Sequence, residues 1–301
     1  MRKSTFLSLL LIFALLLPGL VMAQDTTTTE EVDVLADIVM PRLVEYNAAM
    51  ADVGYGTLKL DDFMAMLAED PESVTILDVR EVAEVEETGV VEGAINIPLR
   101  TLGENLDLLP DLEATIVVIC KSGFRATLGM ANLQVLGYTN AKVLIGGMGA
   151  YLAEEYPVVP EPAMVEAGEV PADIDPLLVE YVAANLANLP EGWGVVTPAN
   201  LFEEMFETMP DLLMDVRSDA EWADPGYIEG ATHIWVNTIM ENLDLLPEDL
   251  EANIVVYCAS GYRGGIGMTM LQLMGYTNVR NLAGGVNGWL AAELPVLKPE
   301  S

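Results

Sequence analysis

The sequence predicts an α/β fold that occurs twice along the chain, each copy a parallel sheet with helices on both faces. The chain has 301 residues, which is enough for two domains of ordinary size. Within the first copy, short β-branched runs at 74–77 and 116–119 alternate with helical stretches at 61–67 and 126–136. Continuous apolar runs are typical of buried parallel strands, and their alternation with helices indicates the α/β class.

The chain repeats itself once. Leu77-Asp78-Val79-Arg80 returns as Met214-Asp215-Val216-Arg217, at an offset of 137 residues. Cys120-Lys-Ser-Gly-Phe-Arg125 returns as Cys258-Ala-Ser-Gly-Tyr-Arg263, at an offset of 138. The paired glycines at 146–147 and 284–285 follow at the same offset. Separated blocks that recur in one order indicate a duplication.

The composition divides the chain into five expected segments. Three prolines and several glutamates between the copies give a stretch that cannot bury a face and suits a semi-rigid linker. A threonine-rich stretch before the first copy is expected to be disordered. The segments are a signal peptide at 1–23, a leader at 24–34, a first domain at 35–157, a Pro/Glu-rich linker at 158–173 and a second domain at 174–298.

The first residues have the pattern of a secretory signal. Arg2 and Lys3 precede an apolar run from Phe6 to Leu17, and small residues lead to a cleavage point after Ala23. We therefore expect an exported protein, periplasmic or extracellular. An uncleaved membrane anchor is the alternative, although the run is short for a span and is followed by Pro18. Beyond this segment no membrane association is expected.

The charge of the chain restricts its partners. The first 23 residues hold Arg2, Lys3 and no acid, so the remainder has 47 acidic and 11 basic residues. Such an acidic protein is a poor match for nucleic acid or anionic membranes, and the acid surface suits solubility. One histidine and two cysteines provide no ligand set for a metal, and no cofactor is expected.

The two cysteine loops carry the chemistry. In each copy a strand leads into cysteine, four further residues, arginine and then a helix. Backbone N–H groups and the helix N-terminus can converge on the sulfur, and with the arginine they favour the nucleophilic thiolate. A glycine in each loop allows the tight curl. The candidate residues are Cys120 and Cys258 as nucleophiles, with Lys121, Ser122, Gly123, Phe124, Arg125, Ala259, Ser260, Gly261, Tyr262 and Arg263 around them.

Two other interpretations of the cysteines stay open. They can be small buried hydrophobes at strand ends, the common fate of a free cysteine. They can also form one disulfide, although each ends an internal strand of its own domain, which makes close approach difficult. The retention of Cys, Ser, Gly, an aromatic residue and Arg at one spacing in both copies favours a reactive loop.

Supporting residues are expected at neighbouring strand ends. Asp78 with Arg80, and Asp215 with Arg217, fall at the carboxyl edge of the predicted sheets, where ligands bind in such folds. The arginines either pair with the aspartates or contact substrate, and the sequence gives both roles equal weight. His233, which stands where the other copy has Asn96, is interpreted as structural.

Together these motifs resemble the rhodaneses in their tandem form, over about 57 to 152 and 196 to 293. The resemblance rests on the Asp-Val-Arg strand ends, Gly93 to Pro98, both Cys-x-x-Gly-x-Arg loops and the Gly-Gly pairs. The sequence departs from the family after the glycines at 89 and 226, where the usual histidine is absent from both copies. We expect this loss to affect local stability rather than chemistry.

The resemblance implies a sulfurtransferase. A cysteine would take the sulfane sulfur of thiosulfate or of an inorganic or protein persulfide, and pass it to cyanide or a thiol. The loop is one residue shorter than in related phosphatases, and it does not match the mercaptopyruvate-specific loop. Lys121, replaced by Ala259 in the second copy, suggests that the first loop is the better thiosulfate site. The alternative is a persulfide carrier or redox-sensing module that does not turn over small donors.

Overall fold

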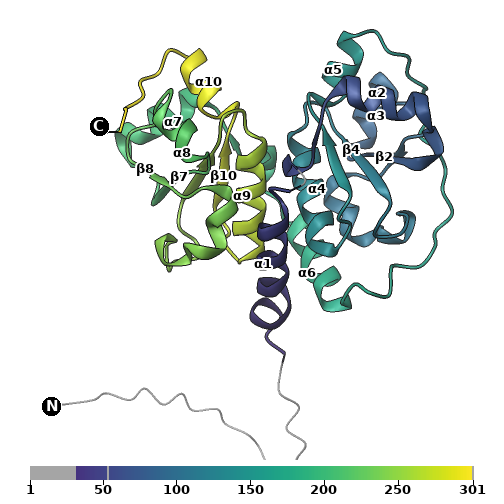
Figure 1. Cartoon of the computed structure of the whole chain (residues 1–301), viewed down its shortest axis with the longest axis horizontal. Coiled ribbons are helices and arrows are strands. Elements are labelled where there is room, and N and C mark those ends of the chain that lie inside the picture. Colours follow the sequence, from purple (N-terminus) through teal and green to yellow (C-terminus); the bar gives the residue numbers. More distant parts are fainter. Residues whose placement is uncertain (1–31, 53, 300–301) are drawn as a thin grey trace, which may run out of the picture. The chain divides into compact units, whose positions relative to one another are not determined.

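The structure is a computed structural model that describes residues 32–52 and 54–299. The expected signal peptide and most of the expected leader lie outside these residues. Within them the chain forms two five-stranded parallel sheets (Figure 1), as the sequence predicts. No helix in the described ranges has the length and apolar character needed to cross a bilayer.

The first sheet has the strand order β1-β5-β4-β2-β3, and all of its pairs are parallel. Its two longest strands, β2 and β4, coincide with the β-branched runs seen in the sequence and are almost wholly buried. The strands are β1 (Thr57–Leu58), β2 (Val74–Asp78), β3 (Ile95–Asn96), β4 (Thr115–Ile119) and β5 (Ala141–Leu144).

The second sheet repeats this topology in the order β6-β10-β9-β7-β8, again with parallel pairs. An identical order confirms that the sequence repeat is a structural one. Its strands are β6 (Val195–Val196), β7 (Leu212–Asp215), β8 (Ala231–His233), β9 (Ile254–Tyr257) and β10 (Val279–Leu282).

Helices cover both faces of each sheet. In the first repeat the helix after the cysteine loop begins at Phe124, two residues earlier than the sequence predicts. The first repeat has α1 (Met40–Ala49), α2 (Leu60–Glu69), α3 (Val82–Thr88), α4 (Phe124–Leu136) and α5 (Gly147–Ala153), and the second has α6 (Pro176–Ala187), α7 (Pro198–Glu207), α8 (Asp219–Ala223), α9 (Tyr262–Leu273) and α10 (Gly285–Ala291). Shorter helical turns are η1 (Val34–Val39), η2 (Gly54–Gly56), η3 (Pro71–Ser73), η4 (Leu99–Glu104), η5 (Leu106–Leu108), η6 (Glu191–Gly194), η7 (Val236–Glu241) and η8 (Leu243–Leu245).

The buried apolar side chains form three clusters. One lies on the outer face of the first sheet and includes Phe63 of α2 and Tyr151 of α5. The second sheet has a corresponding outer cluster with Leu201 of α7 and Trp289 of α10. The largest cluster is shared by both repeats, because α4 and α9 pack against each other between the sheets (Figure 1). The two repeats therefore bury their inner faces in one continuous core.

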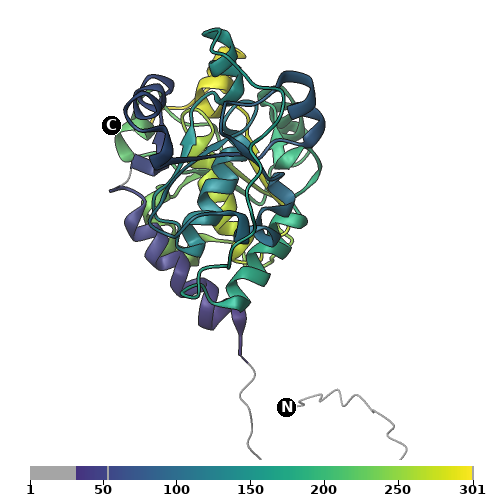
Figure 2. The same ribbon diagram turned by 90° about the vertical axis from the view of Figure 1, so that its right-hand side faces the viewer.

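The helix that leads into each repeat packs against the other repeat. Asn47 of α1 donates from Nδ2 to the carbonyl of Val236 at 2.6 Å and accepts the N–H of Met240 at 3.2 Å. The purple α1 lies below and between the two repeats in Figure 1 and at the lower left of the molecule in Figure 2. Helix α6 packs on η4, so closely that a Cβ at Gly103 would lie 2.6 Å from Cα of Ala183. The expected sequence limits thus do not separate two independently packed bodies.

The predicted linker follows the surface of the first repeat. Val159 pairs with Val90 in an antiparallel bridge, and the N–H of Ala163 donates to the carbonyl of Ala94 at 2.8 Å. In the second repeat Leu297 makes the equivalent bridge to Tyr227. Both repeats therefore end with the same bridge.

Candidate active site

Each cysteine lies at the base of a tight loop between a central strand and a buried helix. In the first loop the N–H of Gly123 donates to Sγ of Cys120 at 3.1 Å, and in the second that of Gly261 donates to Sγ of Cys258 at 3.1 Å. These glycines have φ of 98° and 104°, in the left-handed region, as the expected curl requires. Among the described residues, one amide per loop donates to the sulfur, fewer than the sequence suggests.

The paired glycines support the loops from below. The N–H of Met148 donates to the carbonyl of Cys120 at 2.8 Å, and that of Val286 to the carbonyl of Cys258 at 2.8 Å. A Cβ at Gly147 would lie 2.2 Å from the Cys120 carbonyl oxygen. Helices α5 and α10 can approach the loops this closely only because glycine stands there.

Both cysteines are buried and free. Each is 1% exposed, and they are not joined to one another, which rules out the disulfide interpretation for this structure. Burial alone also suits a structural cysteine. The amide directed at each sulfur, in a loop that opens on a cavity, favours the reactive interpretation.

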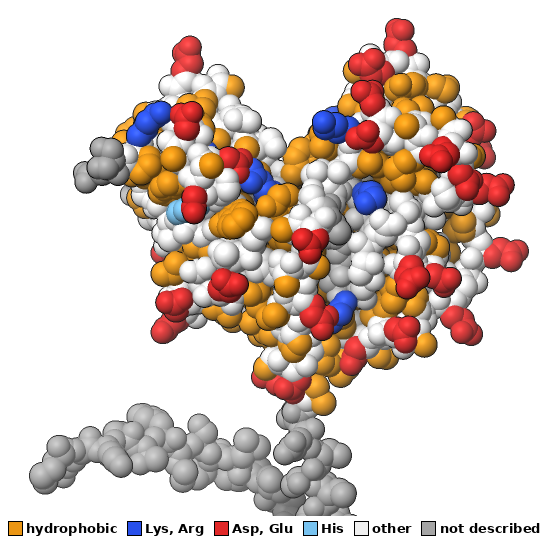
Figure 3. Space-filling view, viewed as in Figure 1, with side chains coloured by type: hydrophobic (Ala, Val, Ile, Leu, Met, Phe, Trp, Pro, Cys, Tyr) orange, Lys and Arg blue, Asp and Glu red, His pale blue; other side chains and the backbone are white. Residues whose placement is uncertain are grey.

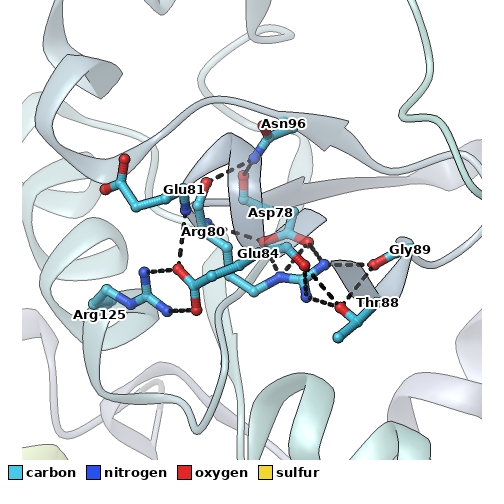
Figure 4. Close-up of polar contacts among 8 residues, drawn as sticks. All are labelled: Asp78, Arg80, Glu81, Glu84, Thr88, Gly89, Asn96 and Arg125. Atoms are coloured by element: carbon cyan, nitrogen blue, oxygen red, sulfur yellow. Dashed lines mark hydrogen bonds and ion pairs between the residues drawn. The ribbon is translucent and has the colours of Figure 1, made fainter. Parts of the chain in front are cut away.

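The strand-end arginines are committed to ion pairs. Arg80 pairs with Asp78 at 2.6 Å and also donates to the carbonyl of Gly89 at 2.7 Å, as Figure 4 shows. Arg217 pairs with Asp215 at 2.5 Å, and the side chains of both arginines are at most 3% exposed. Of the two roles left open by the sequence, the structure therefore shows the ion pair, which fixes the strand ends beneath the loops.

His233 and Asn96 have the same structural role. Nε2 of His233 lies 2.7 Å from the carbonyl oxygen of Arg217, and Nδ2 of Asn96 donates to that of Arg80 at 2.9 Å. The interpretation of His233 as structural is consistent with this contact.

The loop arginines bind carboxylates that the sequence analysis missed. Arg125 pairs with both oxygens of Glu84, at 2.5 and 2.7 Å (Figure 4), and Arg263 does the same with Glu221, at 2.7 and 2.5 Å. Hydrogen bonding to Arg125 lowers the pKa of Glu84, and hydrogen bonding to Arg263 lowers the pKa of Glu221 to about 2. A signal existed, because each glutamate stands four residues after the arginine of an Asp-Val-Arg strand end.

Aromatic rings cross from each repeat to the loop of the other. Trp193 of the second repeat lies 5.2 Å from the guanidinium of Arg125, and Tyr55 of the first lies 5.7 Å from that of Arg263. Both rings are on Gly-aromatic-Gly turns with φ of 63° and 59°, a strained backbone for residues with a side chain. The recurrence of this turn at 54–56 and 192–194 is the sequence signal for these two aromatic residues.

The loops also touch directly through Tyr262. Its hydroxyl accepts the N–H of Gly146 at 3.0 Å and donates to the carbonyl of Ser122 at 3.3 Å. A Cβ at Gly123 would lie 2.7 Å from its ring. Burial raises the pKa of Tyr262, which keeps the hydroxyl protonated as a donor. Phe124, its counterpart, packs against Gly265 of α9 without a hydroxyl to donate.

Both loops line one cavity of about 670 Å³. Figure 3 shows the surface hollowed between the two repeats, with acidic side chains scattered over the visible face. Among the expected site residues, Lys121, Ser122, Phe124, Arg125, Ser260, Gly261 and Tyr262 line the cavity, and Glu81, Glu84, Trp193, Val195, Asn281, Ala283 and Gly284 complete it. The cysteines, Gly123, Ala259, Arg263 and the Asp-Arg pairs are not among the residues that line the cavity.

Comparison with known proteins agrees with the geometry. The family model described as rhodanese-like domain matches residues 59–154 and 198–292. A sulfurtransferase from Allochromatium vinosum is 34% identical over 101 residues, which cover 34% of this chain and 92% of that protein. The thiosulfate sulfurtransferase GlpE of Haemophilus influenzae is 31% identical over 101 residues, covering 34% of this chain and 91% of that protein.

Among solved structures, a rhodanese-related protein from Thermoplasma volcanium has 34% sequence identity and a TM-score of 0.32, covering 36% of this chain and 100% of that one. Each of these relatives corresponds to a single repeat in length. The family model matches both repeats, and both have the same strand order. The chain therefore belongs to the rhodanese-like domain family and carries its domain in tandem.

Proposed function

We propose that the protein is a sulfurtransferase in which Cys120 and Cys258 each carry sulfur as a persulfide. The observation that carries this proposal is the same in both repeats: a loop amide donates to the sulfur at 3.1 Å, in a loop that lines the cavity. Such a contact stabilises an anionic sulfur. Sulfurtransferases among the relatives support the same chemistry.

The reaction has two half-steps. The cysteine thiolate attacks the outer sulfur of thiosulfate, the S–S bond of the donor breaks, and sulfite leaves with the bonding electron pair. A thiol or cyanide then attacks the terminal sulfur of the persulfide, and the cysteine thiolate is released. A persulfide, free or on a partner protein, replaces thiosulfate without changing these steps.

The first loop is proposed as the better thiosulfate site. Lys121 lies in the cavity wall and is exposed, whereas Ala259 holds its place in the second loop. The other loop cation, Arg125, is neutralised by Glu84. Lys121 therefore supplies the positive charge that attracts a dianionic donor.

Steady-state kinetics with thiosulfate and cyanide test these assignments. We expect Cys258→Ser to retain the larger share of kcat/KM and Cys120→Ser the smaller, with no activity in the double variant. Lys121→Ala should lower kcat/KM by about 2- to 5-fold, because one partly exposed charge contributes at most about 1 kcal/mol. Equal kinetics for the two single variants would contradict the proposal that the first loop is the better thiosulfate site. Activity in the double variant would contradict the persulfide mechanism.

A second function has one observation in its favour. Both cysteines are only 1% exposed, which limits the access of donors in solution and suits a persulfide carrier that does not turn over small donors. In that case thiosulfate would leave both thiols unmodified, whereas a persulfide-bearing protein would load them.

We further propose that residues 1–23 direct export and are removed. The support is the charged, apolar and small-residue pattern of this segment. The test is the N-terminal mass of the protein recovered outside the cytoplasm. A chain that begins at Gln24 is expected, and one that begins at Met1 in the membrane fraction would indicate an anchor.

A further inference from the structure

The cavity between the loops is larger than its inorganic substrates require. Its volume of about 670 Å³ falls within the roughly 300 to 1,000 Å³ of sites for organic molecules. Thiosulfate and cyanide would leave most of this space unfilled. The size points to a substrate with a substantial body.

The walls of the cavity are mainly apolar and aromatic. Phe124, Tyr262 and Trp193 provide rings, and Val195 and Ala283 provide aliphatic surface. The ring of Trp193 lies 4.7 Å from the guanidinium of Arg100 and 5.2 Å from that of Arg125. Arg100 also donates to the carbonyls of Ala187 and Pro190 at 3.2 and 3.0 Å. The part of the Trp193 ring that lines the cavity is a surface for an apolar group.

The charges at the cavity cancel. Glu81, Glu84, Lys121 and Arg125 are two acids and two bases, and Arg125 is paired with Glu84. Such a lining has no overall preference for an anion, although Lys121 gives one end a local positive charge. Away from Lys121 the walls therefore suit an apolar body.

The two loops share this cavity rather than each having its own. The ring of Tyr262 is the neighbour of Gly261, which donates to Cys258, and it also lies against Gly123, which donates to Cys120. A molecule that fills the space beside Phe124 and Tyr262 is therefore next to both loops.

We propose that this cavity binds an organic thiol with an apolar or aromatic body, and that this thiol serves as sulfur acceptor for both cysteines. The sulfur chemistry rests on the proposed function. The acceptor thiol loses its proton to solvent, and its thiolate attacks the terminal sulfur of a cysteine persulfide. The bond between that sulfur and the cysteine Sγ breaks, the cysteine thiolate leaves, and the acceptor departs as its persulfide with no net oxidation.

Binding is measured by titration calorimetry on the full chain with Cys120→Ser and Cys258→Ser combined, so that no sulfur transfer occurs. The probes are benzyl mercaptan and 2-mercaptoethanol under anaerobic conditions. We expect benzyl mercaptan to bind at least about tenfold more tightly than 2-mercaptoethanol, since a buried ring contributes more than about 1.4 kcal/mol. Equal affinity for the two probes would overturn the proposal.

Two variants test the location. Trp193→Ala removes the aromatic wall, and Ala283→Leu fills the cavity while every Trp193 contact is kept. Each should weaken benzyl mercaptan binding by about tenfold, whereas Phe206→Ala on α7, 76% exposed and outside the cavity wall, should leave it unchanged. Unchanged binding in both cavity variants would overturn the proposal. If persulfide never forms on the wild type, the proposed function fails while these binding results still decide the inference.

Discussion

Each loop arginine is held by a carboxylate from the helix after the Asp-Val-Arg strand end. Glu84 and Glu221 belong to the first turns of α3 and α8, where they also accept the N–H of Glu81 and Ser218 at 3.2 Å. The arginine and its carboxylate form a pair with little net charge. In each loop the direct contact to the sulfur is instead the glycine amide, which donates to Sγ at 3.1 Å.

The first prediction at the residue scale concerns Glu221→Gln. Because the ion pair lowers the pKa of Glu221 from 4.5 to about 2, it stabilises the folded state above pH 4.5, and this contribution is lost as the pH falls toward 2. We expect the variant to lose about 1 to 2 kcal/mol of unfolding free energy at pH 7, after solvent screening of this partly exposed pair. Urea denaturation at several pH values measures the difference.

The difference between wild type and Glu221→Gln should shrink steadily between pH 4.5 and pH 2. Glu229→Gln, at an exposed position of the same repeat, is the control and should show no such trend. A gap that stays constant over this range would mean that the ion pair does not stabilise the fold.

At this scale the sequence predicted the positions but not all of the partners. The loop glycines follow from the need for a tight curl, and both have a left-handed φ. Glu84 and Glu221 recur at the same distance from the Asp-Val-Arg strand ends, but this spacing does not show that they pair with Arg125 and Arg263 until the fold is known. The roles of Arg80 and Arg217 required the buried distances to Asp78 and Asp215.

At the scale of elements, the two helices after the loops differ in how they meet the neighbouring strand. Nδ2 of Asn281 on β10 donates to the carbonyl of Gly261 at 3.2 Å, and Gly264 of α9 leaves room for this side chain. A Cβ at Gly264 would lie 2.1 Å from Oδ1 of Asn281. The first repeat has Ala126 and Val143 in these places, so the two positions differ together.

This pair of positions gives the second prediction. Gly264→Ala should destabilise the protein by about 1 to 3 kcal/mol through overpacking, and adding Asn281→Val, which copies the first repeat, should restore part of the loss. A double-mutant cycle by urea denaturation, with Asn281→Val alone as the fourth protein, measures the coupling. Additive effects would show that the two side chains do not compete for the same space.

The strands and most helices were predictable from the sequence. The packing of α1 and α6, which precede the two repeats, against the opposite repeat was not. Continuous β-branched runs identify buried strands such as β2 and β4 directly. An apolar face on α1 or α6 shows only that the helix is covered, and not by which repeat. The bonds of Asn47 to Val236 and Met240 are needed to show that α1 packs on the second repeat.

At the scale of the whole molecule, each site is built from both repeats. Trp193 covers Arg125 and Tyr55 covers Arg263, while the inner faces of both sheets share one core. A cysteine loop therefore depends on side chains that are distant in sequence and belong to the other copy. The duplication predicted two sites, but their mutual dependence is visible only in the fold.

Because each ring contacts the loop arginine of the other repeat, its removal should affect the cysteine of that other repeat. Trp193→Ala should slow thiosulfate-dependent turnover by Cys120, measured in the Cys258→Ser protein, and Tyr55→Ala should slow that by Cys258, measured in the Cys120→Ser protein. The expected factor is about 2- to 30-fold, since a contact between a cation and a ring contributes about 0.5 to 2 kcal/mol. If each aromatic variant instead slowed the cysteine of its own repeat, the sites would be separate.

The central claim, covalent sulfur on two cysteines, is tested most directly by the intact mass of the protein. The wild type, Cys120→Ser and Cys258→Ser are weighed before thiosulfate, after it, and after subsequent cyanide. We predict a gain of one sulfur atom per remaining cysteine after thiosulfate and its complete loss with cyanide. No gain on a wild type whose two thiols can still be alkylated would contradict the account.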